Sequence, residues 1–258
     1  MNKINKLFSQ SKDRKLLSIY FCAGCPTIGG TADVIRTLER RGIDMIEVGM
    51  PFSDPLADGP VIQEAGTIAL RNGMTTDILF SQLKEIKDEI QIPLVWMGYL
   101  NIVMHYGYER FFEKCVESGI SGVIIPDLPF QDYLDIIKPI ADSHGIRVIM
   151  MITPETSEER IRFIDEHTDG FVYMVSSASI TGAQSEFGDA KVDYFRRIDD
   201  MNLRNPRMIG FGISNRQTLE SAQAYAAGAI IGSKFVTLLR ETGDADEAIN
   251  QLYKALEQ

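Results

Sequence analysis

Histidine, cysteine and positive charge are all scarce in this chain. Its 258 residues include only three histidines, three cysteines and one tryptophan. Lysine and arginine together number 26 against 36 acidic residues, which gives a net charge of −10, and no basic cluster is denser than a pair. Nucleic acids and anionic membranes attract concentrated positive charge, so we expect neither as a partner.

Long apolar stretches are also missing. No run reaches the roughly 18 apolar residues of a membrane-spanning helix, and the polar segment 1–10 has no apolar core of signal-peptide length. The three cysteines, Cys22, Cys25 and Cys115, cannot all pair, which suits a reducing compartment. We therefore expect a soluble protein of the cytoplasm.

The pair Cys22 and Cys25 matches the C-x-x-C pattern of redox and metal sites. A redox dithiol usually begins a helix, whereas Pro26 and the pair Gly29-Gly30 follow here and favour a loop. No second pair of cysteines or histidines completes a zinc site. We expect inert thiols at the end of a strand and no metal, with a redox function as the alternative.

Short apolar runs alternate with longer amphipathic stretches along the whole chain. The runs that predict strands are Leu17–Ala23, Ile43–Val48, Pro93–Gly98, Gly122–Ile125, Arg147–Ile152, Gly170–Val175, Arg207–Phe211 and Ala229–Ile231. The stretches that predict helices are Ala32–Arg41, Pro60–Asn72, Thr76–Glu89, Tyr108–Ser118, Gln131–Ser143, Ser157–Glu166, Val192–Met201, Gln217–Ala226, Ser233–Arg240 and Asp246–Leu256.

Eight such strand–helix units predict an α/β fold, a closed (β/α)8 TIM barrel with a short N-terminal helix and an extra C-terminal helix. Glycines follow several predicted helices, at Gly42, Gly119, Gly145 and Gly228, where they accept the left-handed conformation of a helix end. No linker or low-complexity tract interrupts the chain, so we expect one domain over residues 1–258. A doubly wound sheet is the alternative, but no G-x-G-x-x-G follows the first predicted strand.

Three carboxylates cluster where the second predicted strand ends. Glu47 shares a strand face with Met45, so we expect it in the mouth of the barrel if Met45 faces inward. Burial there raises the pKa of a carboxyl group, which suits proton transfer near neutrality; a buried structural acid is the alternative. Asp54 and Asp58 follow in a loop stiffened by three prolines, at positions 51, 55 and 60.

The two loop acids have other readings as well. Asp58 precedes Gly59-Pro60, a predicted helix start, so it has the alternative role of capping that helix. Asp54 is expected to organise the loop or to contact a partner. Three close carboxylates are also able to hold Mg²⁺, but nothing in the sequence places a phosphate-bridging metal here, and we expect none.

Glycines after the seventh and eighth predicted strands indicate an anion site. Gly210-Phe211-Gly212-Ile213-Ser214 and Gly232-Ser233 lie where TIM barrels bind phosphate with backbone N–H groups and a helix N-terminus. We expect Thr181-Gly182 to add a hydroxyl and an amide, and Lys234 to point outward. Packing alone is the other explanation for these glycines.

Histidine catalysis is not expected. His144 and His167 fall at predicted helix ends, and His105 falls in a predicted loop. Surface or capping roles explain all three.

Four segments closely resemble the α subunits of tryptophan synthase. They are residues 46–60 (IEVGMPFSDPLADGP), 179–183 (SITGA), 210–214 (GFGIS) and 232–233 (GS). The resemblance runs from about Asn5 to the end of the chain, and the first of these motifs is highly specific to the family.

The resemblance implies a lyase of tryptophan biosynthesis that cleaves indole-3-glycerol phosphate to indole and D-glyceraldehyde 3-phosphate without a metal or organic cofactor. Glu47 would match the acid/base residue that moves protons between indole C3 and the glycerol hydroxyl. Asp58 would match the acid that binds the indole N–H and stabilises the positive indolenine. The implied substrate-binding residues are Tyr20, Tyr173, Thr181, Gly182, Phe211, Gly212, Gly232 and Ser233.

The resemblance also implies a partner, a β subunit that carries pyridoxal phosphate, in an α2β2 tetramer. Asp54, Pro55 and Asn101 match positions that face this partner. The chain departs from better-known members at Cys25, where Asp is common, and at Tyr20, where Phe often lines the indole pocket. It also departs at Ser177-Ala178-Ser179, in a loop where Ser-Arg-x-Gly is frequent; these departures bear on loop closure and coupling to the partner.

Three other functions remain open on the sequence. A different phosphosugar barrel, such as an isomerase, shares the phosphate site but does not need Glu47 together with Asp58. A stand-alone indole-producing lyase has the same site residues and no partner. A non-enzymatic activator of a β subunit does not need Glu47 for its effect.

Overall fold

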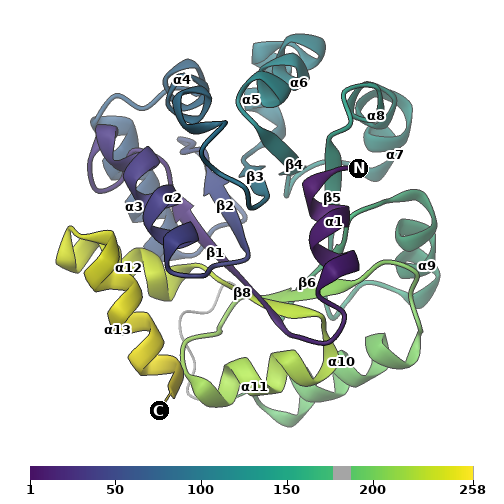
Figure 1. Cartoon of the computed structure of the whole chain (residues 1–258). Coiled ribbons are helices and arrows are strands. Elements are labelled where there is room, and N and C mark those ends of the chain that lie inside the picture. Colours follow the sequence, from purple (N-terminus) through teal and green to yellow (C-terminus); the bar gives the residue numbers. More distant parts are fainter. Residues whose placement is uncertain (177–186, 258) are drawn as a thin grey trace.

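The computed structural model describes residues 1–176 and 187–257. Eight parallel strands close into a barrel in chain order, with β8 paired to β1 (Figure 1). The strands are β1 (Leu16–Cys22), β2 (Met45–Gly49), β3 (Leu94–Met97), β4 (Ile120–Ile124), β5 (Arg147–Ile152), β6 (Val172–Val175), β7 (Arg207–Gly210) and β8 (Gly228–Ile231). The predicted (β/α)8 barrel is therefore confirmed.

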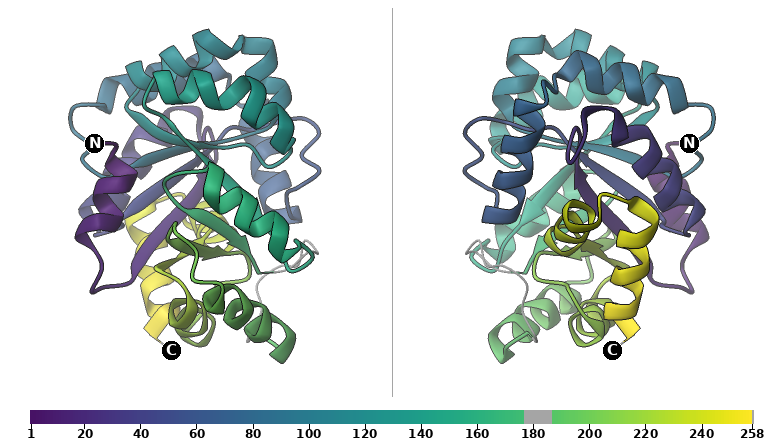
Figure 2. Two further views of the ribbon diagram at one scale, coloured as in Figure 1. Left: turned by 90° about the vertical axis from the view of Figure 1, so that its right-hand side faces the viewer. Right: turned by 90° about the vertical axis from the view of Figure 1, so that its left-hand side faces the viewer.

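Helices surround this barrel. They are α1 (Lys3–Gln10), α2 (Thr31–Arg40), α3 (Pro60–Arg71), α4 (Thr76–Ile86), α5 (Leu100–Tyr106), α6 (Tyr108–Glu117), α7 (Phe130–Asp132), α8 (Lys138–Ser143), α9 (Glu158–His167), α10 (Asp189–Asp200), α11 (Arg216–Tyr225), α12 (Ser233–Thr242) and α13 (Ala245–Glu257), with the 3₁₀ helix η1 (Ile28–Gly30) and the π-helical turn η2 (Tyr133–Ile137). The last two, α12 and α13, pack side by side on one flank of the barrel (Figure 2). No helix in the described ranges is long and apolar enough to cross a membrane.

Two apolar layers hold the barrel together, because side chains alternate between the two faces of each strand. The larger cluster lies between strands and helices and includes Ile46 and Val48 of β2. The smaller cluster fills the interior and includes Met45 of the same strand together with Val95 of β3. Met45 thus faces inward, and Glu47, two residues further on, follows it on the inner face.

Helix α1 closes the end of the barrel at which the strands begin. Its Ile4 is fully buried in the interior cluster, and a Cβ at Gly122 would lie only 2.6 Å from the Ile4 side chain. The Asn2 side chain accepts from the Ile4 N–H and donates to the carbonyls of Ser121 and Gly145. The predicted N-terminal helix is confirmed, and it leaves the opposite end of the barrel for a ligand.

The structure differs from the sequence prediction after β3, where Leu100–Tyr106 forms α5 in place of the expected loop. Asp127 accepts the N–H of Leu100 at 2.8 Å, so the start of α5 is held by a residue from the turn after β4. Because the residue that holds this helix start lies 27 positions further along the chain, the sequence around Leu100 does not reveal the helix. His105 therefore lies in a helix and not in a loop.

The glycine predictions hold at three of four positions. Gly42, Gly119 and Gly145 have φ of 84°, 76° and 69°, as a left-handed helix end requires. Gly228 is different, because it is the first residue of β8 and pairs with Leu16 of β1. A Cβ there would lie 2.3 Å from the Leu16 carbonyl oxygen, so the glycine permits close strand contact.

Candidate active site

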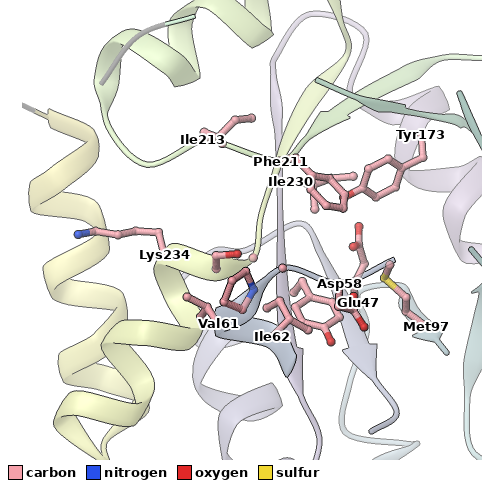
Figure 3. Close-up of a pocket in the computed structure, with 16 residues that line it drawn as sticks. Glu47, Asp58, Val61, Ile62, Met97, Tyr173, Phe211, Ile213, Ile230 and Lys234 are labelled. Carbon is pink, nitrogen blue, oxygen red and sulfur yellow. The ribbon is translucent and has the colours of Figure 1, made fainter. Parts of the chain in front are cut away.

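One pocket opens at the carboxyl ends of the strands and encloses about 770 Å³, part of it open to solvent (Figure 3). Both predicted catalytic residues and six of the predicted substrate-binding residues line it: Glu47, Asp58, Tyr20, Tyr173, Phe211, Gly212, Gly232 and Ser233. The other two, Thr181 and Gly182, lie outside the described residues, as do Ser177-Ala178-Ser179. Ile213 of the predicted anion-binding segment also lines it, and further lining comes from Met97 and Ile230, which sequence reasoning did not assign to a site.

Glu47 is fully buried at the floor of this pocket. The Ser18 hydroxyl of β1 donates to its Oε1 at 3.3 Å, and its Oε2 has no hydrogen-bond partner within the described ranges. Burial raises the pKa of Glu47 to about 8, while the Ser18 hydrogen bond acts in the opposite direction. A carboxyl group in this state is protonated at neutral pH and able to act as a general acid.

Asp58 lies on the loop that follows β2. Tyr99 donates its hydroxyl to Asp58 Oδ2 at 2.9 Å and accepts the N–H of Ala57 at 3.0 Å. Burial raises the pKa of Asp58 to about 6, against the lowering effect of the Tyr99 hydrogen bond. The N-cap residue of α3 is Gly59, and the carboxyl group of Asp58 is engaged with Tyr99, so the structure favours a pocket role over the capping alternative.

The pKa values of the two acids therefore separate around neutrality. At pH 7 Glu47 is mostly protonated and Asp58 mostly ionised, so one pocket holds a proton donor and a fixed negative charge together. Environments that separate two carboxyl groups in this way assign them different roles in catalysis.

Two tyrosines, Tyr20 and Tyr173, line the pocket, and each lies over a glycine of the next strand. A Cβ at Gly49 would lie 2.2 Å from the Tyr20 hydroxyl, and a Cβ at Gly210 would lie 2.2 Å from that of Tyr173. Each ring therefore fits only because the glycine beneath it has no side chain. The ring of Phe211 meets Tyr173 edge-on at 6.2 Å, which completes an apolar space suited to a flat aromatic ligand.

Part of the pocket lining is backbone. Phe211 and Gly212 both have a left-handed backbone conformation, with φ of 70° and 79°. Glycine adopts this conformation without strain, whereas phenylalanine does not. The Ser176 hydroxyl donates to the Phe211 carbonyl at 2.6 Å and helps to hold this turn.

Helix α12 starts at Ser233, directly after Gly232, and no side chain caps its N-terminus. The first N–H groups of such a helix, with its dipole, favour an anion. Lys234 lines the pocket but points away from both acids (Figure 3). The two acids and the backbone N–H groups thus lie at different parts of the same pocket.

The residues predicted to face a partner lie at the surface beside this pocket. Asp54 and Asn101 are exposed and Pro55 is half-buried. Their neighbour Leu56 is 87% exposed, an unusual state for a large apolar side chain in a rigid loop. Phe52 stacks on Tyr99 at 5.1 Å, so this loop and the start of α5 are one packed unit.

Sequence reasoning gave no role to Ser18 or Tyr99, the two hydroxyl donors. Tyr99 follows β3 at the carboxyl end, and Ser18 is the one serine at an inward position of an otherwise largely apolar strand. The sequence shows where these two residues lie, but it does not show that Tyr99 binds Asp58 or that Ser18 binds Glu47. Cys22, the last residue of β1, and Cys25, in the turn after it, are buried free thiols. In the described ranges no group of three or more His, Cys, Asp or Glu side chains is arranged to hold a metal.

Comparison with known proteins agrees with this geometry. A family model described as "Tryptophan synthase alpha chain" matches residues 8–258. The chain is 66% identical over 257 residues to the tryptophan synthase alpha chain of Phocaeicola vulgatus, covering 99% of both proteins. It is 63% identical over 256 residues to that of Bacteroides thetaiotaomicron, covering 99% of this chain and 100% of the other. The crystal structure of the tryptophan synthase alpha chain from Legionella pneumophila is similar with a TM-score of 0.89 at 30% identity, covering 99% of this chain and 96% of that one.

Proposed function

This chain belongs to the tryptophan synthase alpha chain family, and we propose that Glu47 and Asp58 carry out its reaction. As a member it is a carbon–carbon lyase that cleaves indole-3-glycerol phosphate in tryptophan biosynthesis. The observation that carries the proposal is the pair of acids in one pocket, with pKa values of about 8 and about 6.

In the proposed chemistry Glu47 gives one proton to the indole ring and takes another from the glycerol hydroxyl, so its protonated form is restored. Protonated Glu47 delivers its proton to C3 of the indole, and the ring becomes a positively charged indolenine. Asp58, ionised, accepts the hydrogen bond of the indole N–H and stabilises that charge. Glu47, now a carboxylate, removes the proton of the glycerol hydroxyl as the carbon–carbon bond breaks, which releases indole and D-glyceraldehyde 3-phosphate.

The phosphate is proposed to bind at the backbone N–H groups around Gly212, Gly232 and Ser233. Support comes from the uncapped start of α12 and from the left-handed turn at Gly212, both on the pocket lining. Tyr20, Tyr173 and Phe211 are proposed to enclose the indole ring. Thr181 and Gly182 are proposed to complete the phosphate site.

We propose that the partner is a tryptophan synthase β subunit, in an α2β2 tetramer, and that Asp54, Pro55 and Asn101 face it. Support comes from the exposure of Asp54, Asn101 and the apolar Leu56 beside the pocket. We further propose that the chain needs no cofactor of its own, with pyridoxal phosphate only in the partner. Buried free thiols support a cytoplasmic location, and the closed barrel supports a single domain over residues 1–258.

A steady-state assay of indole release from indole-3-glycerol phosphate tests the proposal. Glu47→Gln and Asp58→Asn are each expected to lower kcat by at least roughly 100-fold, the scale of a lost general acid–base group. Wild-type activity in either variant, with the fold intact by circular dichroism, would contradict the assigned roles. An Asp54→Asn variant should keep its activity alone and lose part of the stimulation by an added β subunit.

A further inference from the structure

Ser18 occupies an unusual place in the barrel interior. It lies on β1 between Leu16, which packs in the interior cluster, and Tyr20, which lines the pocket, so its side chain is on the same inward face. Ser18 is fully buried. A hydroxyl group in an apolar layer is unfavourable unless it finds a hydrogen-bond partner.

That partner is the carboxyl group of Glu47. In the pairing of β1 with β2, Ser18 lies opposite Met45 and Tyr20 opposite Glu47, so Ser18 is a diagonal neighbour of the acid. Its Oγ lies 3.3 Å from Oε1. The second oxygen, Oε2, is equally buried and has no partner within the described ranges.

We propose that Ser18 is a positioning residue for Glu47, fixing the rotation of the carboxyl group so that Oε2 exchanges the proton with the substrate. The assignment rests on the proposed function of Glu47. A donated hydrogen bond also favours the ionised form of its acceptor, so Ser18 moderates the proton affinity that burial gives to Glu47.

The other titratable groups around Glu47 do not replace this contact. Tyr20 from β1 and Tyr173 from β6 face the acid, and burial raises the pKa of both well above the usual range, so both stay neutral. Asp58 faces the same pocket from the loop after β2 and carries a like charge, which cannot favour ionisation of Glu47. Lys234 points away.

The experiment compares Ser18→Ala with the matched pair Ser18→Thr and Ser18→Val, which differ from each other by a hydroxyl in place of a methyl group. The alkaline limb of kcat against pH and the ¹³C titration of the Glu47 carboxyl carbon are both measured, the latter assigned by its loss in Glu47→Gln. The Ala and Val variants should shift both upward by about 0.5–1 pH unit, the scale of one hydrogen bond to an ionised group. Ser18→Thr should stay within half of that shift.

Ser118→Ala is the control, because Ser118 is also buried and donates to the Phe80 carbonyl at 3.1 Å on the outer side of the barrel. It should lower the melting temperature and leave both titrations unchanged. The proposal is overturned if Ala and Val titrate like the wild type, or if Thr shifts as far as Val. Activity retained in Glu47→Gln would instead overturn the role of Glu47 itself, so the two failures are distinguishable.

Discussion

The Tyr99 hydroxyl lies 2.9 Å from Oδ2 of Asp58 and fixes this acid to the first turn of α5. The same hydroxyl accepts the Ala57 N–H, so it holds both the side chain of Asp58 and the backbone before it. Tyr99 is also the residue before α5, the helix that carries the exposed Asn101. A contact that moves α5 at this surface would therefore also move Asp58, through Tyr99.

Removing this hydroxyl should move the acid limb of the pH profile. Because the hydrogen bond lowers the pKa of Asp58, Tyr99→Phe should raise that pKa above its present value of about 6. The acid limb of kcat should move upward by about 0.5–1 pH unit, the scale of one hydrogen bond to an ionised group. Tyr106→Phe, which removes a hydroxyl donated to the exposed Asp77, is the control and should leave the limb unchanged.

The wild-type protein should show a bell-shaped dependence of kcat on pH. Activity needs ionised Asp58 and protonated Glu47, so it should fall below about pH 6 and above about pH 8. kcat/KM reports the pKa values of the ligand-free enzyme, so it is measured beside kcat and corrected for the phosphate of the free substrate, which titrates at about pH 6. A profile that stays flat between pH 5 and 9 would contradict the assignment of the two acids.

Burial of Glu47 should cost stability at high pH. Its folded pKa of about 8 lies above the unfolded value of 4.5, so the neutral form stabilises the fold at low pH and this contribution is lost as pH rises through 8. Glu47→Gln cannot ionise. Its free energy of unfolding relative to wild type should therefore rise between pH 5 and pH 9, by on the order of 4 kcal/mol.

Urea unfolding of both proteins at the two pH values measures this difference. Comparing the pair cancels the self-repulsion of the acidic chain, which both proteins share. An equal difference at both pH values would show that Glu47 titrates normally.

A methyl group at Gly210 should disturb the substrate pocket. The added Cβ would meet the Tyr173 hydroxyl at 2.2 Å, so the ring must move, and the fold should lose about 1–3 kcal/mol of stability, the usual cost of overpacking. KM for indole-3-glycerol phosphate should rise because Tyr173 lines the pocket. Gly188→Ala is the matched control, since a Cβ there meets nothing within 4 Å.

Periodicity in the sequence was enough to predict the barrel and to place Glu47 on the same strand face as Met45. Side chains alternate strictly along a strand, so Glu47 faces the same way as Met45, and the structure shows that this side is the interior. Helix ends marked by Gly42, Gly119 and Gly145 were also predictable, because the left-handed conformation has a strong residue preference.

Contacts between distant segments were not predictable in the same way. Asp127 holds the start of α5, Tyr99 reaches Asp58 across 41 positions, and Ser18 reaches Glu47 across 29. Each depends on strand register and loop geometry, which one sequence does not specify. The misreading of Gly228 has the same origin, since its partner is the Leu16 carbonyl of a strand at the other end of the chain.

The place of α1 in the fold limits when this helix docks during folding. Ile4 is made before the segments that it packs against, which include Gly122 and Gly170. Chains usually fold in the order in which they emerge, and apolar surface left waiting promotes aggregation. The face of α1 with Lys3, Lys6 and Gln10 is polar, and the buried place of Ile4 exists only after the segments with Gly122 and Gly170 have folded, so we expect α1 to dock late.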